Sequence, residues 1–137
     1  MNKEERELLL TDLCSRLPYE VKVYNEVLKD TCILKSVDIL SPDKITVFCR
    51  LLNSSEIGAT IEDIKPYLRP IFSMTKEEKK DYELLCDYYM DDKEEEHYFN
   101  NFATLDWLNQ KHFDYRGLIK LGLALEAPEG MYNIKYE

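Results

Sequence analysis

Residues 32–52 have the sequence Cys-Ile-Leu-Lys-Ser-Val-Asp-Ile-Leu-Ser-Pro-Asp-Lys-Ile-Thr-Val-Phe-Cys-Arg-Leu-Leu. Two segments rich in branched apolar residues, 32–40 and 45–52, flank the tetrapeptide Ser-Pro-Asp-Lys at 41–44. Proline presets the φ angle that a β-turn requires at its second position, and aspartate is common beside it. The stretch therefore predicts two strands joined by a tight turn.

Short apolar segments on both sides of this hairpin predict further strands. Val21 and Val23 alternate with their neighbours. Residues 57–61 form a short run that contains β-branched residues, and residues 64–70 contain two prolines. Short strands at such close spacing are typical of a small all-β unit. We therefore expect an antiparallel β-meander or an SH3-like barrel here.

The N-terminal segment predicts a helix. Leu9, Leu13 and Leu17 recur at four-residue spacing, which places them on one face of a helix over residues 3–17. Pro18 ends this helix, because a residue that precedes proline is disfavoured in the helical conformation. We expect the helix to cover one open side of the β unit, which gives an α+β fold.

The C-terminal half begins with predicted helices. Thr75 and Glu78 have the spacing of a capping box, in which the threonine and the glutamate each bond to the other's backbone amide. This pattern predicts a helix over 76–90. Thr104 is placed to cap a second, shorter helix over 105–112.

The last third of the chain predicts one more helix and a hairpin. Asp114 is placed to cap a helix over 115–121. Residues 123–127 and 131–136 then predict the two strands of a C-terminal β-hairpin. Gly130 falls at the position of the turn that requires a left-handed backbone conformation.

The composition bounds the size and class of the protein. Its 137 residues suffice for one domain, which we expect to span 1–137 with sub-parts 1–70 and 71–137. With 45% hydrophobic and 12% aromatic residues the chain is globular, because a disordered chain lacks this apolar content. The polar N-terminus is unlike a signal peptide, and no apolar run approaches the ~18–20 residues of a membrane span, so we expect a cytoplasmic protein.

The charge and the cysteines exclude further classes. A formal net charge of -9 argues against broad binding to phosphate backbones, which needs a surplus of lysine and arginine. Cys14, Cys32, Cys49 and Cys86 lack the spacing of a zinc site and have apolar neighbours, so we expect free thiols that pack as small hydrophobic groups. Without a P-loop or a similar glycine-rich motif, the sequence predicts no cofactor, and its two histidines predict no dedicated metal site.

Acidic residues are concentrated in 76–100, which holds four basic and ten acidic side chains, a net charge of -6. One interpretation is a solvated helix face followed by an acidic loop. The alternative is a phosphate mimic that occupies a nucleic-acid-binding groove of another protein.

Residues 112–117, His-Phe-Asp-Tyr-Arg-Gly, form the densest group of reactive side chains. In a small hydrolase, His112 would be a general base, Asp114 its orienting carboxylate and Arg116 a clamp for an anion. The simpler interpretation is a junction between two helices. There the aspartate caps a helix, the aromatic residues pack and the arginine pairs with an acid.

Two parts of the chain are similar in arrangement to nucleic-acid-binding domains, so nucleic-acid binding remains an alternative. The helices and hairpin of 104–136 are similar in order to the end of a winged-helix domain, and the N-terminal β unit is similar to an SH3-like nucleic-acid platform. Their net charges are -1 over 104–137 and -2 over 1–70. Neither has the basic footprint of a nucleic-acid-binding surface, so a protein partner suits both parts better.

Aromatic residues are dense between 88 and 115, where eight fall within 28 positions. Tyrosine and tryptophan are favoured at protein interfaces because they bury a large area at a small entropic cost. In a chain of this length, some of these eight aromatic residues are needed for the hydrophobic core. We expect the rest to form an interface, and the candidate residues are Tyr88, Tyr89, Trp107, Phe113, Tyr115 and Arg116.

Three segments together carry a family resemblance. They are residues 12–23 (Asp-Leu-Cys-Ser-Arg-Leu-Pro-Tyr-Glu-Val-Lys-Val), residues 65–70 (Lys-Pro-Tyr-Leu-Arg-Pro) and residues 102–133, which begin Phe-Ala-Thr-Leu-Asp-Trp-Leu-Asn. In these segments the chain resembles a family, without assigned activity, of gut Bacteroidetes and their phages or mobile elements. The resemblance implies a bacterial cytoplasm and a phage or prophage origin, and no catalytic or cofactor-binding residue.

These observations favour a non-enzymatic protein–protein interaction module, encoded by a phage or prophage and acting on a host protein. Its partner is a protein that the sequence does not identify. Nucleic-acid binding is the second hypothesis, and a small hydrolase built on His112 and Asp114 is the third.

Overall fold

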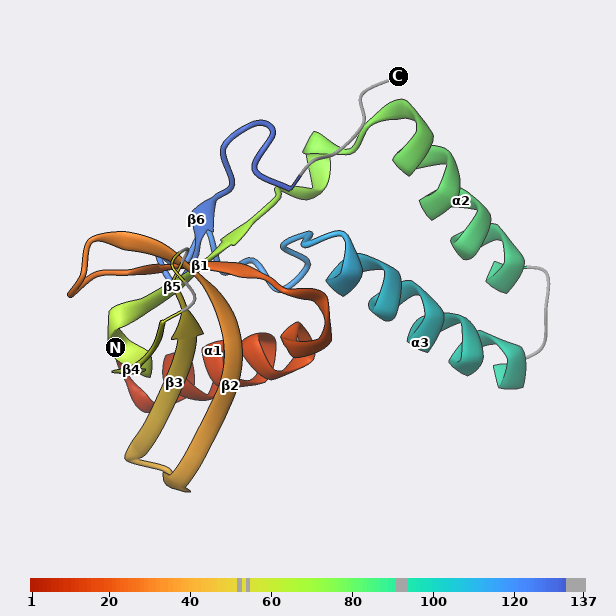
Figure 1. Ribbon diagram of the computed structural model, residues 1–137. Coiled ribbons are helices and arrows are strands. Elements are labelled where there is room, and N and C mark those ends of the chain that lie inside the picture. The colour runs from red at the N-terminus through yellow and green to blue at the C-terminus, as the bar shows by residue number, and fades with distance from the viewer. Residues whose placement is uncertain (52, 54, 91–93, 133–137) are drawn as a thin grey trace.

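The computed structural model describes the backbone of residues 1–51, 53, 55–90 and 94–132, and the side chains in these ranges except those of 87–101. An N-terminal helix and a mixed sheet lie together, and a pair of longer helices extends to one side (Figure 1). The expected α+β class is confirmed. The helices are α1 (Lys3–Ser15), α2 (Lys76–Met90) and α3 (Glu94–Gln110). We call α2 and α3 the arm, and the rest of the described chain the body.

The sheet has six strands in the order β4-β3-β2-β1-β5-β6. All neighbouring strands are antiparallel except β5 and β6, which are parallel. The predicted hairpin is confirmed, since β2 and β3 pair across a turn at Pro42 and Asp43. The strands are β1 (Lys22–Asn25), β2 (Asp30–Ser41), β3 (Lys44–Arg50), β4 (Glu56–Thr60), β5 (Ile64–Leu68) and β6 (Leu125–Glu126).

The sheet curls but stays open. Only the short 3-10 helix Ile61–Asp63 links β4 to β5, although four strand spacings of ~4.8 Å separate them in the sheet. A link of three residues spans roughly 10 Å, so the sheet must curve around it, and Ile61 is buried inside the curve. The strands β4 and β6 remain the two edges of the described sheet. The expectation of an SH3-like barrel is therefore not confirmed, because closure would require β4 to pair with the far side of the sheet.

One face of the sheet carries the core. Residues alternate between buried and partly exposed along β1, β3 and β5, as the period of two along a strand requires. Leu9 and Leu13 of α1 pack against this face, so the helix covers the sheet as expected. All four cysteines are unpaired, with Cys32 and Cys49 in the core, whereas Cys14 is exposed.

The arm differs in length from the expected helices. The helix predicted over 76–90 is confirmed as α2, and Thr75 and Glu78 form both bonds of the capping box. The helix predicted over 105–112 instead begins at Glu94. No proline or glycine interrupts residues 94–110, and acidic residues in the first turn favour a helix start because they offset the helix dipole.

The segment that follows the arm is built from turns. The helix expected over 115–121 is wrong: residues 118–122 form turns, and Gly117, inside the expected helix, has a φ angle of 76°, outside the right-handed helical region. The C-terminal hairpin is not confirmed either. Residues 125 and 126 pair in parallel with β5, and residues 133–136 of the expected second strand lie outside the described part of the chain. Gly130 does adopt the expected left-handed conformation, with φ 82°.

Candidate functional site

Aromatic side chains form a stack at the base of the arm, where the chain passes from α3 back into the body. The rings of Trp107 and Phe113 are stacked with centroids 5.7 Å apart, and the Tyr82 ring lies 5.8 Å from Trp107. The guanidinium carbon of Arg69 lies 4.2 Å from the centroid of Phe113. Trp107 is half-buried and Phe113 is fully buried, so Phe113 packs in the interior and offers no surface to a partner.

A buried ion pair ties the arm to the body. Two nitrogens of Arg69, next to the end of β5, donate to the two carboxylate oxygens of Glu78 in α2 over 2.8 and 2.6 Å. Burial alone would raise the pKa of Glu78. Hydrogen bonds from Arg69 and from the Thr75 amide outweigh this effect and lower that pKa below its ordinary value. Glu78 is therefore ionised at neutral pH and serves both as helix cap and as anchor.

A second ion-pair cluster lies where α1 meets the turns after α3. Asp12 and Arg16 are both fully buried, and Arg16 donates to Asp12 over 2.9 and 3.1 Å and to the carbonyl oxygen of Phe113 over 2.7 Å. Arg116 Nε lies 3.3 Å from an oxygen of the same aspartate. Arg116 therefore pairs with an acid, as the junction interpretation expects, but this acid is 104 positions earlier in the chain.

Tyr115 joins this cluster to α3. Its ring lies 5.3 Å from the guanidinium carbon of Arg16 and 5.0 Å from that of Arg116, distances typical of cation–π contacts. Its hydroxyl donates to Asn109 Oδ1 over 2.7 Å. Both Tyr115 and Arg116 are half-buried, so they reach the surface with part of each side chain.

His112 and Asp114 have separate structural roles. His112 is buried at a positive φ of 64°, with its ring stacked 3.9 Å from that of Tyr132. Burial, together with the charges of Arg16, Arg69, Lys22 and Lys111, lowers the pKa of His112 to about 3. Both oxygens of Asp114 accept from the amides of Leu118 and Ile119, over 2.8 and 3.0 Å.

Asp114 thus accepts hydrogen bonds from backbone amides, as its expected role requires, but these amides belong to a turn and lie two residues later than Arg116 and Gly117, the amides expected from the sequence. A histidine whose pKa is about 3 is a weak proton acceptor at neutral pH. No hydrogen bond joins His112 to Asp114 among the contacts of the described residues. The geometry is therefore that of a packed junction.

The other two candidate interface residues are Tyr88 and Tyr89. Their backbone belongs to α2, and their side chains lie outside the described residues. The expectation that they contact a partner stays a prediction.

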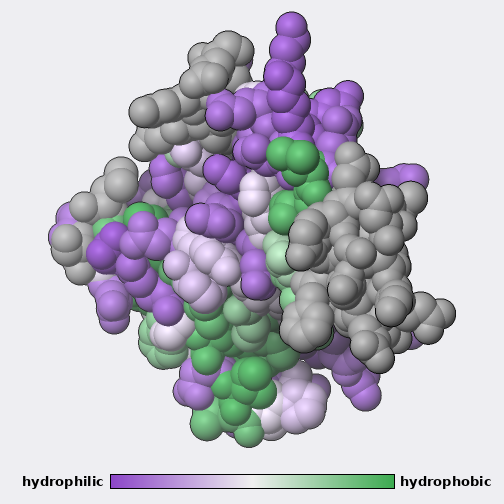
Figure 2. Space-filling model, turned by 90° about the vertical axis from the view of Figure 1, so that its right-hand side faces the viewer, coloured by the Kyte–Doolittle hydropathy of each residue, from purple (hydrophilic) through white to green (hydrophobic). Residues whose placement is uncertain are grey.

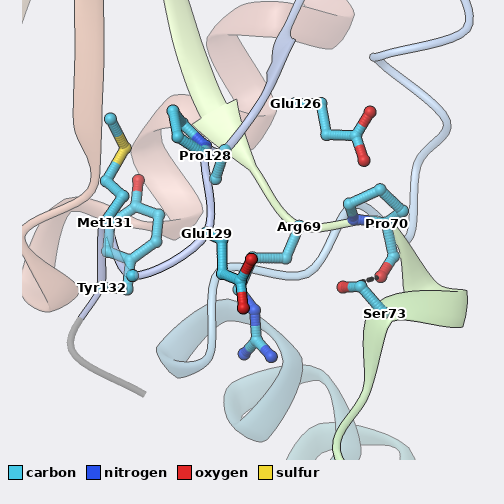
Figure 3. Close-up of a pocket in the computed structure, with 10 residues that line it drawn as sticks. Arg69, Pro70, Ser73, Glu126, Pro128, Glu129, Met131 and Tyr132 are labelled. Atoms are coloured by element: carbon cyan, nitrogen blue, oxygen red, sulfur yellow. Dashed lines mark hydrogen bonds between the residues drawn. The ribbon is translucent and has the colours of Figure 1, made fainter.

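A polar pocket of about 280 Å³ lies between the end of β5 and residues 126–132 (Figure 3). Figure 3 shows the carboxylates of Glu126 and Glu129 well apart, and the Arg69 guanidinium pointing away from the loop, toward its partner in the arm. The Tyr132 hydroxyl, which also lines the pocket, donates to the Tyr67 carbonyl oxygen over 2.7 Å. The polar groups of this pocket are thus mostly engaged in holding the fold.

Large apolar side chains are exposed on both the arm and the body. Leu84, Phe102 and Leu105 are exposed on the arm. Ile39 and Leu40 are exposed near the tip of the β2–β3 hairpin. Figure 2 views the side from which the arm extends and shows hydrophobic residues gathered low on the molecule, at the height of α1 and this hairpin in Figure 1.

Two absences in the described part of the structure concern metal clusters and membrane-spanning helices. Within the residues that it describes, no three His, Cys, Asp or Glu side chains are grouped to hold a metal ion. Over the same residues, no helix combines the length and apolar character that crossing a membrane requires. Comparisons with protein-family models, with curated proteins and with solved structures find no match to this chain.

Sequence reasoning missed the two buried ion pairs for different reasons. Asp12 and Arg16 have the four-residue spacing of a helical ion pair, so a signal was present. The pairing of Arg69 with Glu78 had no local signal, because the two residues lie in different elements. The exposure of Leu84 and Phe102 likewise depends on how the two helices pack.

Proposed function

We propose that this protein is a protein–protein interaction module whose arm binds a basic partner protein. The exposed apolar side chains of the arm carry the proposal. Leu84 on α2 and Phe102 on α3 are each 67% exposed, and Leu105 is 40% exposed. Exposed apolar groups of this size favour a binding role, because covering them with a partner contributes roughly 25 cal/mol per Å².

The pairing of the two helices sets the height of each of these side chains along the arm. Tyr82 of α2 contacts Trp107 of α3, and Figure 1 shows the helices running antiparallel. Leu84 therefore lies at nearly the same height as Leu105, and Phe102 lies about one helical turn farther from the body. The arm extends away from the sheet, so a partner can reach its outer surface (Figure 1).

The charge of the same segment supports a basic partner. Residues 76–100 contain ten acidic and four basic side chains. Complementary charge speeds association and excludes partners of the same sign. A second copy of this chain would bring two acidic arms together, so a different, basic protein is the better occupant. A protein with a basic groove that binds nucleic acid is one kind of basic partner. The acidic segment would then mimic the phosphates of the nucleic acid in that groove.

The anchoring of the arm adds to the proposal. The Arg69–Glu78 pair and the stack of Trp107 on Phe113 hold the base of the arm against the body. A surface that is already ordered loses less conformational entropy on binding. The resemblance to proteins of gut Bacteroidetes and their phages leads us to propose a host protein as the partner.

The test is a pull-down from a gut Bacteroidetes lysate treated with nuclease. Three proteins serve as bait: wild type, an arm variant carrying Leu84→Ser and Phe102→Ser, and a body variant carrying Leu40→Ser. Leu40 is 74% exposed, so the body variant controls for loss of an exposed apolar side chain outside the arm. Trp107 is a poorer target than these residues because it packs on Phe113, and its loss would disturb the fold.

We expect wild type and the body variant to retain the same basic protein, and the arm variant to retain at least about tenfold less, a difference of ~1.4 kcal/mol. Excess duplex DNA should compete if the partner surface is a nucleic-acid groove. Equal retention by all three baits contradicts the proposal. Retention that disappears with nuclease favours the nucleic-acid alternative instead.

A further inference from the structure

A groove of about 500 Å³ lies on the body, between the solvent face of the sheet and the loop at residues 128–131. We propose that this groove binds a small organic anion, namely a phosphate or carboxylate group carried on an apolar body. The site is separate from the arm and does not depend on the function proposed above. The argument rests on a row of three side chains and on the charges around it.

The row crosses three neighbouring strands. Lys22 of β1 is opposite Ile33 of β2, and Ile33 is opposite Arg50 of β3. Residues in register on neighbouring strands point to the same face, with strands ~4.8 Å apart. Lys22 and Arg50 therefore stand about 10 Å apart on either side of Ile33. All three residues line the groove, so it has an apolar floor between two cations.

The two cations of this row are not neutralised by acids. Arg50 is half-buried, and its guanidinium makes no hydrogen bond or ion pair in the described part of the chain, even though Glu56 is opposite it on β4. Lys22 donates to the carbonyl oxygen of Met131 over 2.8 Å. An ammonium group has three donors, so two remain beyond this bond. The Tyr132 ring also lies 5.8 Å from this ammonium, on one side of it.

Two other lysines of this sheet are already paired with acids. Lys35 lies 3.5 Å from Glu20, and Lys65 lies 3.2 Å from Glu26. Lys29 and Lys44 make no ion pair among the described residues, but both are exposed to water, whereas Lys22 and Arg50 in the groove are half-buried. A half-buried guanidinium without an acceptor loses solvation, and an anionic ligand would restore that lost interaction.

The loop that covers the groove favours a small anion with an apolar part. Pro128 and Met131 are apolar lining residues, and Gly130 has the left-handed conformation that turns the loop over the sheet. The volume falls within the ~300–1,000 Å³ of small-molecule sites. Glu129 is the one acid that lines the groove. A long polyanion would meet the repulsion of a chain with net charge -9, so a small ligand is the better fit.

The experiment is a titration of the isotope-labelled full-length protein followed by NMR. Adenosine 5′-monophosphate and octanoate are the phosphate and carboxylate probes, and adenosine is the control that lacks the anionic group. The variants are Arg50→Gln and Glu129→Gln, with Lys35→Gln as the matched control for loss of a cation outside the groove. The spectrum of each variant without ligand shows that the fold is retained.

We expect saturable shifts at amides 31–33, 50 and 129–131 with at least one of the two anions, and weaker binding of adenosine than of its monophosphate. A response to the nucleotide alone identifies phosphate as the anionic group, and a response to octanoate alone identifies carboxylate. Arg50→Gln should weaken binding about tenfold, and Glu129→Gln should strengthen it about threefold by removing a repulsive charge.

Three results would overturn the proposal. The first is the absence of shifts with both anions at millimolar concentration. The second is equal binding of adenosine and its monophosphate, which would remove the role of the two cations. The third is a loss of affinity in Lys35→Gln as large as that in Arg50→Gln, since a general effect of net charge would then explain the binding.

Discussion

The body and the arm hold their side chains in place by different means. In the body, fifteen apolar residues from α1, the β-sheet region and residues 118–124 form one continuous core. No residue of this core comes from the described part of the arm, where Leu108 is the one buried apolar side chain. The arm depends instead on the Arg69–Glu78 pair and on aromatic stacking at its base. Because the core of the body is formed without the arm, the outer surface of the arm is available for a partner.

The largest effect should come from the buried ion-pair cluster of the body. Asp12→Ala leaves the fully buried Arg16 without its acid, and Arg116 loses the same partner. We expect a loss of about 4 kcal/mol in the free energy of unfolding, because an uncompensated buried charge is costly. Urea denaturation measures this loss. Glu7→Ala on the exposed side of α1 is the control, and a similar loss in both variants would contradict the role of the cluster.

A core leucine gives the next largest effect. Leu34 is 1% exposed in the centre of the body core. Leu34→Ala should lower the free energy of unfolding by about 3 kcal/mol, since it removes apolar contacts and leaves a cavity. The same denaturation experiment tests it. A loss below about 1 kcal/mol would mean that the core packs less tightly than the structure shows.

The Arg69–Glu78 pair tests whether the arm can be loosened by itself. Glu78→Gln keeps the shape of the side chain but removes the charge opposite Arg69. We expect a cost of about 2 to 3 kcal/mol, because a hydrogen bond between charged groups is lost in a buried site. Hydrogen exchange should speed up in residues 79–86 of α2 far more than in β2. Equal acceleration in both would show that the arm and the body unfold as one unit.

His112 should make stability depend on pH. Its pKa is about 3 when folded and near 6.5 when exposed. Below pH 6.5 the unfolded chain therefore binds a proton that the folded protein does not, and stability falls as the pH decreases toward 3. Between pH 6.5 and 5 the loss should be about 2 kcal/mol.

The control for this pH dependence is His112→Asn. Asparagine tolerates the positive φ of this position, so the backbone should be retained. The variant should show a much flatter curve from pH 7 to 5 in thermal melts. If both proteins respond equally, the pH dependence comes from other groups. Glu62 and Glu78 do not interfere in this range, because their lowered pKa values place their titration at more acidic pH.

The smallest effect should come from the exposed surface of the arm. Leu84→Ala changes a side chain that is 67% exposed, so the free energy of unfolding should change by less than about 0.5 kcal/mol. Together with Leu34→Ala, this variant compares the same substitution in the body and in the arm. A cost as large as that of Leu34→Ala would show that Leu84 is covered in solution, for example by a second copy of the chain.

The strands and the start of α2 could be predicted because their signals are local. The branched apolar run over 45–52 and the Thr75–Glu78 capping box each involve neighbours in sequence, and the strand and the cap that they predict are confirmed. The open edges of the sheet could not be predicted, because they depend on which strands meet across the whole fold. Residues 115–121 contain helix-compatible residues, yet Gly117 and the two amides bonded to Asp114 favour turns.

The sequence by itself determined the α+β class, the order of the elements through residue 90 and the acidity of residues 76–100, because periodicity, capping and charge are properties of neighbouring residues. Only the tertiary structure decided that Phe113 is buried, that Arg116 meets Asp12, and that Arg50 lines the same groove as Lys22 with no acid partner among the described residues. These contacts join residues from distant parts of the chain. Their energies arise from burial and pairing in three dimensions, which no local pattern records.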